Sequence, residues 1–403
     1  MRKYTIMIMC GALAACMSAC GGKAKSPGAT EQSSGVAGIV PETYGHASAD
    51  SAVMVRPRYA KGYTVTYLPS GVRLVNVSDP QEGSGVSAPG HYALVPRGSA
   101  ASVPEGYTRI EVPIERAICM TSLQLSNFTA LDAHCYVKGI TGTKNLFNKD
   151  ILERVACGET VKIGTEGNFD AEIIIAANPD VIFVSPFKRG GYEVIKETGI
   201  TLVQHLGYKE LDPLGQAEWI KFVAMFIGKE RAANETFAGI EARYNRTKAA
   251  ARGVARRPTV FSGEMHGGNW YAVGGRSYLA QLFRDAGADY VLEGDSNTGG
   301  VNIEFERMYS IAADADYWRV LNSYPGTFSY KVLRSSEPRN ADFKAFREKK
   351  VIYCNMRETP YYELSPVEPD VVLKDLVAIF HPTLIEKDYE PTFYRLLRAD
   401  DAE

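Results

Sequence analysis

Residues 229–252 read KERAANETFAGIEARYNRTKAAAR. The apolar residues Ala233, Phe237, Ile240 and Tyr244 recur at helical spacing, while charged and amide side chains fill the other positions, so the stretch predicts one amphipathic helix. At 1.5 Å per residue this helix would span roughly 36 Å, about the width of a small domain. We expect it to lie across two bodies of the protein.

The chain on each side of this helix shows the same alternation of short apolar strands and helices. We therefore predict an α/β fold with two α/β lobes, joined by the long helix and separated by a cleft. The alternative is a single larger domain in which residues 229–252 form one more surface helix. The α/β runs lie at residues 137–142, 171–184 and 199–204 before the helix, and at 259–262, 278–291, 315–321 and 351–355 after it.

Residues 57–117 alternate short β-rich runs with Pro- and Gly-containing turns. They predict an extra β-rich N-terminal segment on the first lobe, pairing onto an edge of its sheet. The next segment, ICMTSLQL at residues 118–125, turns from apolar to polar at Thr121 and Ser122. Such strand-to-helix corners are where open α/β sheets place ligand contacts.

The first 20 residues have the three parts of an export signal: a positive end, an apolar middle, and small residues before a cysteine. Both Cys16 and Cys20 follow small residues, as in a bacterial lipoprotein signal, and we favour Cys20 because Gly21-Gly22 then opens a polar tether. The alternative is an ordinary secretory signal cleaved near Ala19. Acyl chains contribute about 0.8 kcal/mol per buried methylene, so they would anchor the protein to a membrane without a spanning helix.

Composition limits the remaining possibilities. The formal net charge of −2 over 403 residues, with no sustained basic face, makes nucleic acid an unexpected partner. After residue 20 no run of 18 apolar residues suggests a spanning segment. We expect five regions: a signal at 1–20, a flexible tether at 21–53, a first lobe at 54–211, a crossover with the inter-lobe helix at 212–256, and a second lobe at 257–403.

The chain carries no motif of an enzyme or a cofactor site. It has no HExxH, GxSxG, GxGxxG or GxxxxGK[ST] pattern, and its six histidines show no metal-ligand spacing. We expect no enzyme activity and no cofactor. Four cysteines follow the signal without a CxxC pair, and either buried thiols or one disulfide among them fits the sequence; they are Cys119, Cys135, Cys157 and Cys354.

Residues 167–185 read GNFDAEIIIAANPDVIFVS and predict a short helix that ends at Pro179 and turns into a strand. Glu172 lies at the head of that helix. The pattern G-N-x-x-x-E-x-I-x-x-x-x-P-D-V-I resembles the periplasmic solute-binding proteins of ABC importers that carry ferric siderophores, haem and cobalamin. The resemblance covers roughly residues 114–397 and implies two α/β lobes bridged by a rigid helix.

The resemblance also implies one glutamate on each lobe that docks into arginine pockets of the permease dimer. Glu172 matches the first, seven residues before Pro179. Residues 301–321 repeat the same order of elements, and Glu306 is expected to be the second. The spacing differs, because Glu306 precedes Ala315 by nine residues, and the neighbouring Glu304 is an alternative.

Three loops at predicted strand ends supply candidate ligand-binding residues. Cations and aromatic rings suit the anionic oxygens and flat surfaces of an iron chelate. A solvated basic turn is the alternative for the first loop, and a core tryptophan for the second. The candidates are Lys188, Arg189 and Tyr192 in PFKRGGY, His266, Trp270 and Tyr271 in EMHGGNWY, and Arg357 after the strand at 351–355.

The sequence thus predicts a membrane-anchored solute-binding protein that captures an iron chelate or cobalamin and delivers it to an ABC permease. One alternative is direct binding of zinc or manganese, using Glu264 and His266 with His134 or His205. A less favoured one is an envelope hydrolase. The loops offer aromatic rings and cations instead of converging metal ligands, which favours a bulky preformed chelate.

Overall fold

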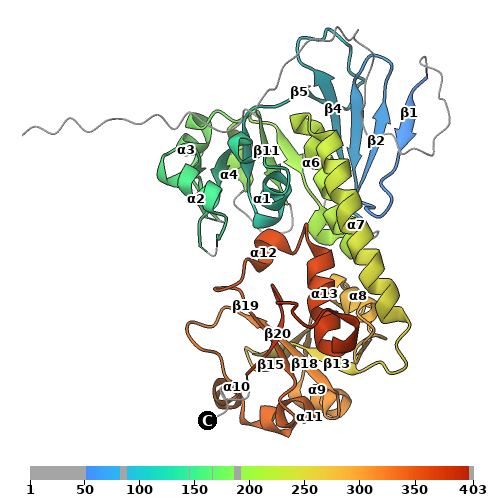
Figure 1. The fold of residues 1–403 in the computed structure, drawn as a ribbon. Helices are drawn as coiled ribbons and strands as arrows, with labels where there is room; N and C mark the ends of the chain where they lie inside the picture. Colours follow the sequence, from blue (N-terminus) through green and yellow to red (C-terminus); the bar gives the residue numbers. More distant parts are fainter. Residues whose placement is uncertain (1–50, 82–88, 145, 166, 186–191, 399–403) are drawn as a thin grey trace, which may run out of the picture. The chain divides into compact units, whose positions relative to one another are not determined.

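The computed structural model describes residues 51–81, 89–144, 146–165, 167–185 and 192–398 (Figure 1). All of them belong to one compact unit, Ala37–Glu403. The predicted signal, its Cys20 and most of the tether lie outside the described residues.

The first lobe is built on a parallel five-stranded sheet in the order β12-β11-β6-β7-β8. Side chains alternate along β11: Val181 and Phe183 enter the central core, whereas Ile182 and Val184 enter a second core on the opposite face. Both faces of the sheet are therefore buried, which explains the continuous apolar run at 181–184. The strands are β6 (Ala117–Cys119), β7 (Val137–Ile140), β8 (Val161–Lys162), β11 (Val181–Val184) and β12 (Leu202–Gln204), and the helices are α1 (Ser122–Thr129), α2 (Lys149–Ala156), α3 (Ala171–Ala176) and α4 (Tyr192–Glu197).

The second lobe contains a separate five-stranded sheet in the order β16-β13-β18-β19-β20, in which β20 is antiparallel. A small antiparallel sheet, β14-β15-β17, lies beside it. The strands are β13 (Thr259–Ser262), β14 (Glu264–His266), β15 (Asn269–Val273), β16 (Asp289–Tyr290), β17 (Gly300–Ile303), β18 (Tyr317–Asn322), β19 (Val351–Asn355) and β20 (Arg395–Leu396). The helices are α8 (Tyr278–Asp285), α9 (Phe305–Ala312), α10 (Tyr330–Ser336), α11 (Lys344–Arg347), α12 (Tyr361–Leu364) and α13 (Pro369–Phe380).

The predicted inter-lobe helix is confirmed as α7 (Glu230–Arg252), with 23 residues and a length of about 34 Å. The apolar positions read from the sequence, Ala233, Phe237, Ile240 and Tyr244, are its buried ones, together with Ala251. Helix α7 packs on α6 (Trp219–Ile227) of the first lobe and on α13 of the second. Before α6, the short helix α5 (Pro213–Ala217) begins at Asp212, which caps it. The central core continues through these helices from one lobe to the other.

The β-rich N-terminal segment forms a sheet of its own, in the order β1-β2-β3-β4-β5. The expected pairing onto the edge of the first lobe's sheet is therefore wrong. The segment instead packs one face on α6, where the Tyr63 ring lies 5.1 Å from Trp219 and 5.3 Å from Phe222. Its strands are β1 (Val53–Val55), β2 (Tyr63–Tyr67), β3 (Arg73–Val77), β4 (Gly90–Pro96) and β5 (Thr108–Val112).

Two buried carboxylates hold the strand-free residues 58–62 against α5 and α6. Glu218 accepts hydrogen bonds from the backbone N–H groups of Arg58 (3.1 Å), Tyr59 (2.7 Å) and Ala60 (3.0 Å). Glu210 accepts them from the next two backbone N–H groups, both at 2.9 Å, and from the Trp219 indole at 3.0 Å. Because these donors would otherwise be unpaired, the carboxylates fix the N-terminal sheet on the first lobe.

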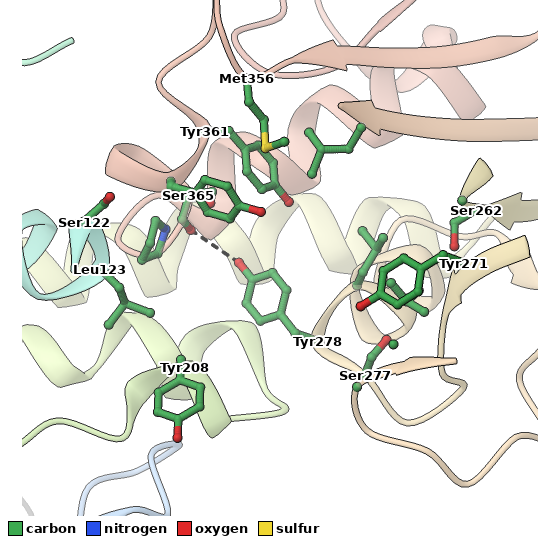
Figure 2. Close-up of a pocket in the computed structure, with 18 of the residues that line it drawn as sticks. Ser122, Leu123, Tyr208, Ser262, Tyr271, Ser277, Tyr278, Met356, Tyr361 and Ser365 are labelled. Atoms are coloured by element: carbon green, nitrogen blue, oxygen red, sulfur yellow. Dashed lines mark hydrogen bonds between the residues drawn. The ribbon is translucent and has the colours of Figure 1, made fainter. Parts of the chain in front are cut away.

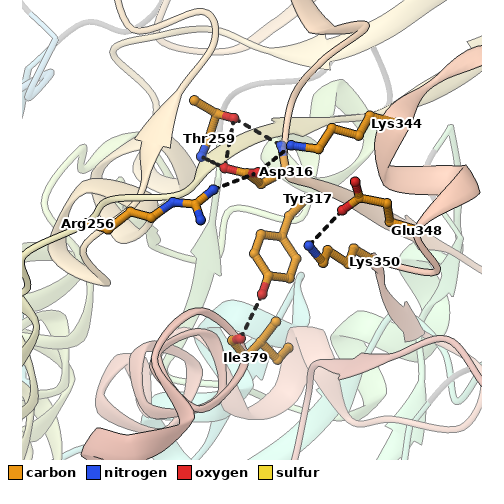
Figure 3. Close-up of polar contacts among 8 residues, drawn as sticks. All are labelled: Arg256, Thr259, Asp316, Tyr317, Lys344, Glu348, Lys350 and Ile379. Atoms are coloured by element: carbon orange, nitrogen blue, oxygen red, sulfur yellow. Dashed lines mark hydrogen bonds and ion pairs between the residues drawn. The ribbon is translucent and has the colours of Figure 1, made fainter.

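The aspartate that follows Pro179 in the first lobe, and its counterpart in the second, make the same contact. Asp180 precedes β11 and accepts hydrogen bonds from the backbone of Glu115 (2.7 Å) and Arg116 (3.0 Å), just before the neighbouring β6. Asp316 precedes β18 and accepts from the backbone N–H of Thr259 (3.1 Å), at the start of the neighbouring β13 (Figure 3). The repeated aspartate therefore joins the starts of two adjacent parallel strands in each lobe.

Charged neighbours surround Asp316. Lys344 lies 2.8 Å and Arg256 3.2 Å from its carboxylate (Figure 3). Burial alone would raise the pKa of Asp316, but the hydrogen bonds from Lys344 and Thr259 outweigh it, so the pKa is lowered. The contact favours the ionised carboxylate and links β13, β18 and α11.

Candidate functional site

A cavity of about 930 Å³ opens where the parallel strands of both lobes end (Figure 2). In the first sheet, β7 and β11 lie on opposite sides of β6, and the residues after β6 and β11, Met120 and Ser185, line the cavity. In the second sheet, β16 and β18 flank β13 in the same way, and Ser262 at the end of β13 lines it. Ligands bind at such reversals of strand order in open α/β sheets.

The corner after β6 is set by a helix cap. Thr121 accepts a hydrogen bond from the backbone of Gln124, and the Gln124 side chain accepts from the Thr121 backbone at 3.1 Å, which completes a capping box. The N-terminus of α1 therefore begins at the cavity wall, where Thr121, Ser122 and Leu123 line it. The strand-to-helix corner predicted at residues 118–125 lies where it was expected.

Tyrosines dominate the aromatic surface of the cavity. Tyr271 on β15 is 50 % exposed and Tyr362 on α12 is 56 % exposed, so both present ring surface to a ligand. The Tyr278 hydroxyl donates to the Ser365 carbonyl at 3.3 Å (Figure 2). The tyrosines of the lining are Tyr208, Tyr271, Tyr278, Tyr361 and Tyr362.

Burial changes the acid–base behaviour of this lining. It raises the pKa of Tyr208, Tyr278 and Tyr362 above the ordinary value of about 10, at which a tyrosine hydroxyl is already protonated and able to donate at neutral pH. Burial is also the main cause of a raised pKa at Glu264, whose carboxylate accepts a hydrogen bond from the Asn322 amide at 3.2 Å.

The wall formed by the first lobe rests on a buried polar chain. The Gln124 amide donates to the Ser185 hydroxyl at 2.9 Å, and that hydroxyl donates to the His205 carbonyl at 3.2 Å. The His205 ring lies 3.3 Å from the Asn127 amide and 4.5 Å, between ring centroids, from Trp219. Burial lowers the pKa of His205 to about 3, so this ring is neutral at physiological pH. It supports the wall and is not part of the lining.

Two polar contacts cross between the lobes near the cavity. Glu363 on α12 accepts hydrogen bonds from the backbone of Phe147 (2.7 Å) and Asn148 (3.2 Å), at the start of α2. The Thr298 hydroxyl, which lines the cavity, donates to the Gln81 side chain at 2.8 Å. The N-terminal segment therefore contacts the second lobe as well as the first.

The residues predicted in EMHGGNWY separate into two groups. This stretch is a β-hairpin, β14 and β15, and not the loop that was expected, with positive φ angles at Gly267 and Gly268 in the turn. His266 and Tyr271 line the cavity. Trp270 is fully buried, and its indole donates to the Ser262 carbonyl at 2.9 Å.

The expected position of Trp270 is corrected by this geometry. Successive side chains of a strand point to opposite faces, so Tyr271 and Trp270 cannot both face the cavity. Trp270 packs with Phe261 and Trp318 in the core of the second lobe, which was the alternative reading of this residue.

Two other predicted ligand-binding residues, Tyr192 and Arg357, are not among those that line the cavity. Tyr192 begins α4, and its hydroxyl donates to the carbonyl of Ser185 at 2.9 Å, so it contacts a lining residue. Arg357 is exposed and follows Met356, which does line the cavity. The role of Arg357 in ligand binding stays a prediction. Lys188 and Arg189 lie outside the described residues.

The two predicted docking glutamates occupy equivalent places. Glu172 is exposed in the first turn of α3, and Glu306 is 77 % exposed in the first turn of α9. Glu306 forms an ion pair with Arg339 at 2.8 Å. The alternative, Glu304, is exposed and precedes α9 at its N-cap position. Their docking role stays a prediction.

Several lining residues were missed by sequence reasoning. Tyr361 and Tyr362 follow the strand at 351–355 within a few residues, a position that could have drawn attention to them. Arg319 is a lone cation inside the apolar strand YWRVLN, which is unusual for a buried strand. Tyr208 and Tyr278 carry no local signal, because only the meeting of the lobes brings them to the cavity.

Three further observations concern metal-binding side chains, membrane-spanning helices and cysteines. In the described part of the chain, no three His, Cys, Asp or Glu side chains gather in a metal-binding arrangement. No described helix is long and apolar enough to cross a membrane. Cys119, Cys157 and Cys354 are free thiols.

Comparisons with known proteins agree with this architecture. The family model described as periplasmic binding protein matches residues 118–357. An uncharacterized lipoprotein of Methanocaldococcus jannaschii is 31 % identical over 303 residues, which cover 72 % of this chain and 70 % of that protein.

Solved structures share the fold at low sequence identity. A periplasmic haem-binding protein of Pseudomonas aeruginosa has a TM-score of 0.55 at 18 % identity, with 71 % of this chain and 99 % of that chain covered. The TroA-like periplasmic binding protein FepB of Veillonella parvula has a TM-score of 0.53 at 19 % identity, with 71 % and 95 % covered. The family match, the lobes joined by α7 and the cavity at their strand ends agree, and this chain belongs to the periplasmic binding protein family of ABC transporters.

Proposed function

We propose that this protein is a lipid-anchored solute-binding protein that captures a bulky metal chelate, either a ferric siderophore, haem or cobalamin, and delivers it to an ABC permease. The observation that carries the proposal is the tyrosine-lined cavity of about 930 Å³ at the strand ends of both lobes.

The size of the cavity supports a bulky ligand. Sites for small organic ligands occupy about 300–1,000 Å³, so this cavity is near the upper end of that range. A bare zinc or manganese ion needs only a few converging ligands at about 2 Å. The exposed rings of Tyr271 and Tyr362 offer flat apolar surface, which suits a macrocycle or an aromatic chelator.

The fold by itself does not identify the ligand, which has to be inferred from the residues that line the cavity. Among solved structures with this fold, one is a haem-binding protein and another is a molybdate-bound protein. Molybdate is a small oxyanion, for which a cavity of this volume is large. The volume and the five lining tyrosines therefore favour the chelates over a small ion.

The first experiment titrates the mature chain, without residues 1–20, with haemin, cyanocobalamin and a set of ferric siderophores while absorbance is followed. We expect one class to bind, and expect Tyr271→Ala to weaken its binding. Tyr107→Ala is the matched control, because Tyr107 directly precedes β5 of the N-terminal sheet and its hydroxyl donates to the Asn76 side chain. If no chelate binds while Zn²⁺ or Mn²⁺ does, the direct metal-ion function replaces this one.

The proposal includes docking on the permease through Glu172 and Glu306. Each carboxylate is exposed in the first turn of a helix, one on each lobe, where an arginine of a partner can reach it. The helix dipole favours a carboxylate at such a helix N-terminus.

Transport and binding assays separate the two roles. Glu172→Ala and Glu306→Ala are expected to leave chelate affinity unchanged and to reduce uptake by the reconstituted permease. Glu235→Ala, an exposed glutamate on α7, is the control and should affect neither. A loss of chelate affinity in Glu172→Ala, or normal uptake in the double variant, would refute the docking role.

We also propose that residues 1–20 are removed, that Cys20 is acylated and that residues 21–53 form a tether. The sequence context of Cys20 and the lipoprotein relative support this arrangement. Metabolic labelling with a fatty acid should mark the wild type and the Cys16→Ser variant, but not Cys20→Ser. Label that persists in Cys20→Ser and disappears in Cys16→Ser would move the anchor to Cys16.

A further inference from the structure

Arg319 is a buried cation at the cavity. It lies in β18, the central strand next to β13, and is 7 % exposed. It lines the cavity, and its guanidinium bonds a single hydroxyl, that of Tyr394, through Nε (3.1 Å) and Nη2 (2.6 Å). Among the described residues no carboxylate lies within 4.0 Å of it, so no ion pair balances its charge.

No described group in the neighbourhood of Arg319 forms a direct ion pair with it. The Tyr394 hydroxyl donates in turn to the Tyr361 hydroxyl, at 3.1 Å. The carboxylate found in the cavity lining belongs to Glu264, which accepts a hydrogen bond from Asn322; the charge of Arg319 acts to lower the pKa of Glu264, but the two groups form no ion pair within 4.0 Å. A guanidinium held largely out of water without a direct counterion is costly, because buried charges are normally paired.

We propose that Arg319 binds an anionic oxygen group of the ligand and makes the cavity selective for anionic chelates over neutral ones. The inference rests on the proposed function. The relevant chemistry is a carboxylate or catecholate oxygen, because a guanidinium forms charge-assisted hydrogen bonds with both. Haem with its carboxylates and ferric tris-catecholates meet this requirement, whereas cobalamin and neutral ferric trihydroxamates do not.

Tyr394 acts as the positioning residue in this arrangement. Its hydroxyl accepts hydrogen bonds from Nε and Nη2 of Arg319, which fixes the plane of the guanidinium. Nη1 forms no hydrogen bond with the described residues. Arg319 is part of the cavity lining. Nη1 is therefore the nitrogen that keeps both of its N–H donors for a ligand oxygen.

Matched probes test the proposal on the unmodified protein. Haemin is compared with its dimethyl ester, which lacks the two negative charges, and a ferric tris-catecholate is compared with a neutral ferric trihydroxamate and with cyanocobalamin. We expect the wild type to bind an anionic probe at least about 10-fold more tightly than its neutral counterpart, since a hydrogen bond to a charged group contributes about 1.5–3 kcal/mol.

Variants then assign the preference to this side chain. Arg319→Met should weaken the affinity for the anionic probe by about 10- to 100-fold and change the affinity for the neutral probe by less than about threefold. Arg319→Lys should keep part of the affinity that Arg319→Met loses. Arg334→Met is the control: Arg334 lies on α10, over the ring of Phe346 and outside the cavity lining.

The outcomes distinguish this inference from the proposed function. Equal wild-type affinity within each probe pair, or preference for cobalamin or the trihydroxamate, overturns the role of Arg319 and leaves chelate capture intact. A well-folded Arg319→Met variant that loses affinity equally for both members of a probe pair also overturns the role of Arg319. If Arg319→Met does not fold, the wild-type comparison still decides. Failure of every probe to bind refutes the proposed function itself.

Discussion

Glu218 provides the sharpest test of how the N-terminal sheet is held. Glu218 is 1 % exposed, and its carboxylate accepts three backbone hydrogen bonds from residues 58–60. It also forms an ion pair with Lys221 at 2.8 Å. Glu218→Ala would leave the N–H groups of Tyr59 and Ala60 without acceptors in a buried place. At about 1–3 kcal/mol for each unpaired group, and with a buried charge pair broken, we expect a loss of about 3–5 kcal/mol in the free energy of unfolding.

The assay is urea denaturation followed by tryptophan fluorescence, since Trp219 is buried against Tyr63 of the N-terminal sheet. Glu218→Gln keeps one acceptor oxygen and should lose about half as much. Glu241→Ala is the matched control. Its carboxylate also bonds Arg58 and the Tyr59 hydroxyl, both at 2.6 Å, but Arg58 is 71 % exposed, so the expected loss is below about 1 kcal/mol.

Two results would refute this reasoning. If Glu218→Ala is no less stable than Glu241→Ala, the buried carboxylate does not hold the N-terminal sheet. If Glu218→Ala unfolds in two transitions, the first of them exposing residues 51–62 to protease, the sheet is attached to the first lobe but is not part of its cooperative unit.

Three further predictions concern stability. Burial lowers the pKa of His205 from 6.5 to about 3, so its contribution to stability is present above pH 6.5 and is lost as the pH falls toward 3. Between pH 7 and pH 5, urea titrations should show that wild type loses about 2 kcal/mol more of its unfolding free energy than His205→Gln does. Because the pKa of Asp316 is lowered in the folded state, its contribution to stability is present above the unfolded pKa and is lost as the pH falls through the folded value. In urea titrations Asp316→Asn should lose about 1–3 kcal/mol of unfolding free energy at pH 7, with less further loss in acid than wild type. Lys344→Met should lose a smaller amount by the same assay. Gly228 ends α6 with φ 68°, so Gly228→Ala should lower stability by about 1 kcal/mol in thermal melts, and an unchanged midpoint would contradict the need for glycine there.

Local patterns in the sequence were sufficient to predict the helices and strands of the two lobes and to recognise that both lobes repeat the same order of elements. The period of Ala233, Phe237, Ile240 and Tyr244 predicted α7, because a helix that packs on two neighbours must repeat its apolar residues every three or four positions. The repeated order of acidic helix head, short helix, aspartate and strand predicted equivalent positions for α3 and α9. The structure adds the reason for the aspartate, which joins adjacent strand starts in both lobes.

Sequence reasoning was less successful where two residues apart in the chain had to be placed together. Gly267-Gly268 was read as a loop, yet it is a hairpin turn, and the alternation along β15 then sent Trp270 to the core and Tyr271 to the cavity. The strands between residues 63 and 112 were recognised, whereas β1 (Val53–Val55) was not, and the partner of the segment was missed because β-pairing depends on contacts that no local pattern encodes.

The sequence alone determined the two α/β lobes, the helix between them and the class of protein, since each depends on periodicity or on a contiguous motif. The tertiary structure decided which side chains meet in the cavity: Tyr208, Tyr278, Arg319 and Tyr361 all come from segments separated by 30 residues or more along the chain. A binding surface formed by long-range packing is a property of distances in space, and spacing along the chain does not contain it.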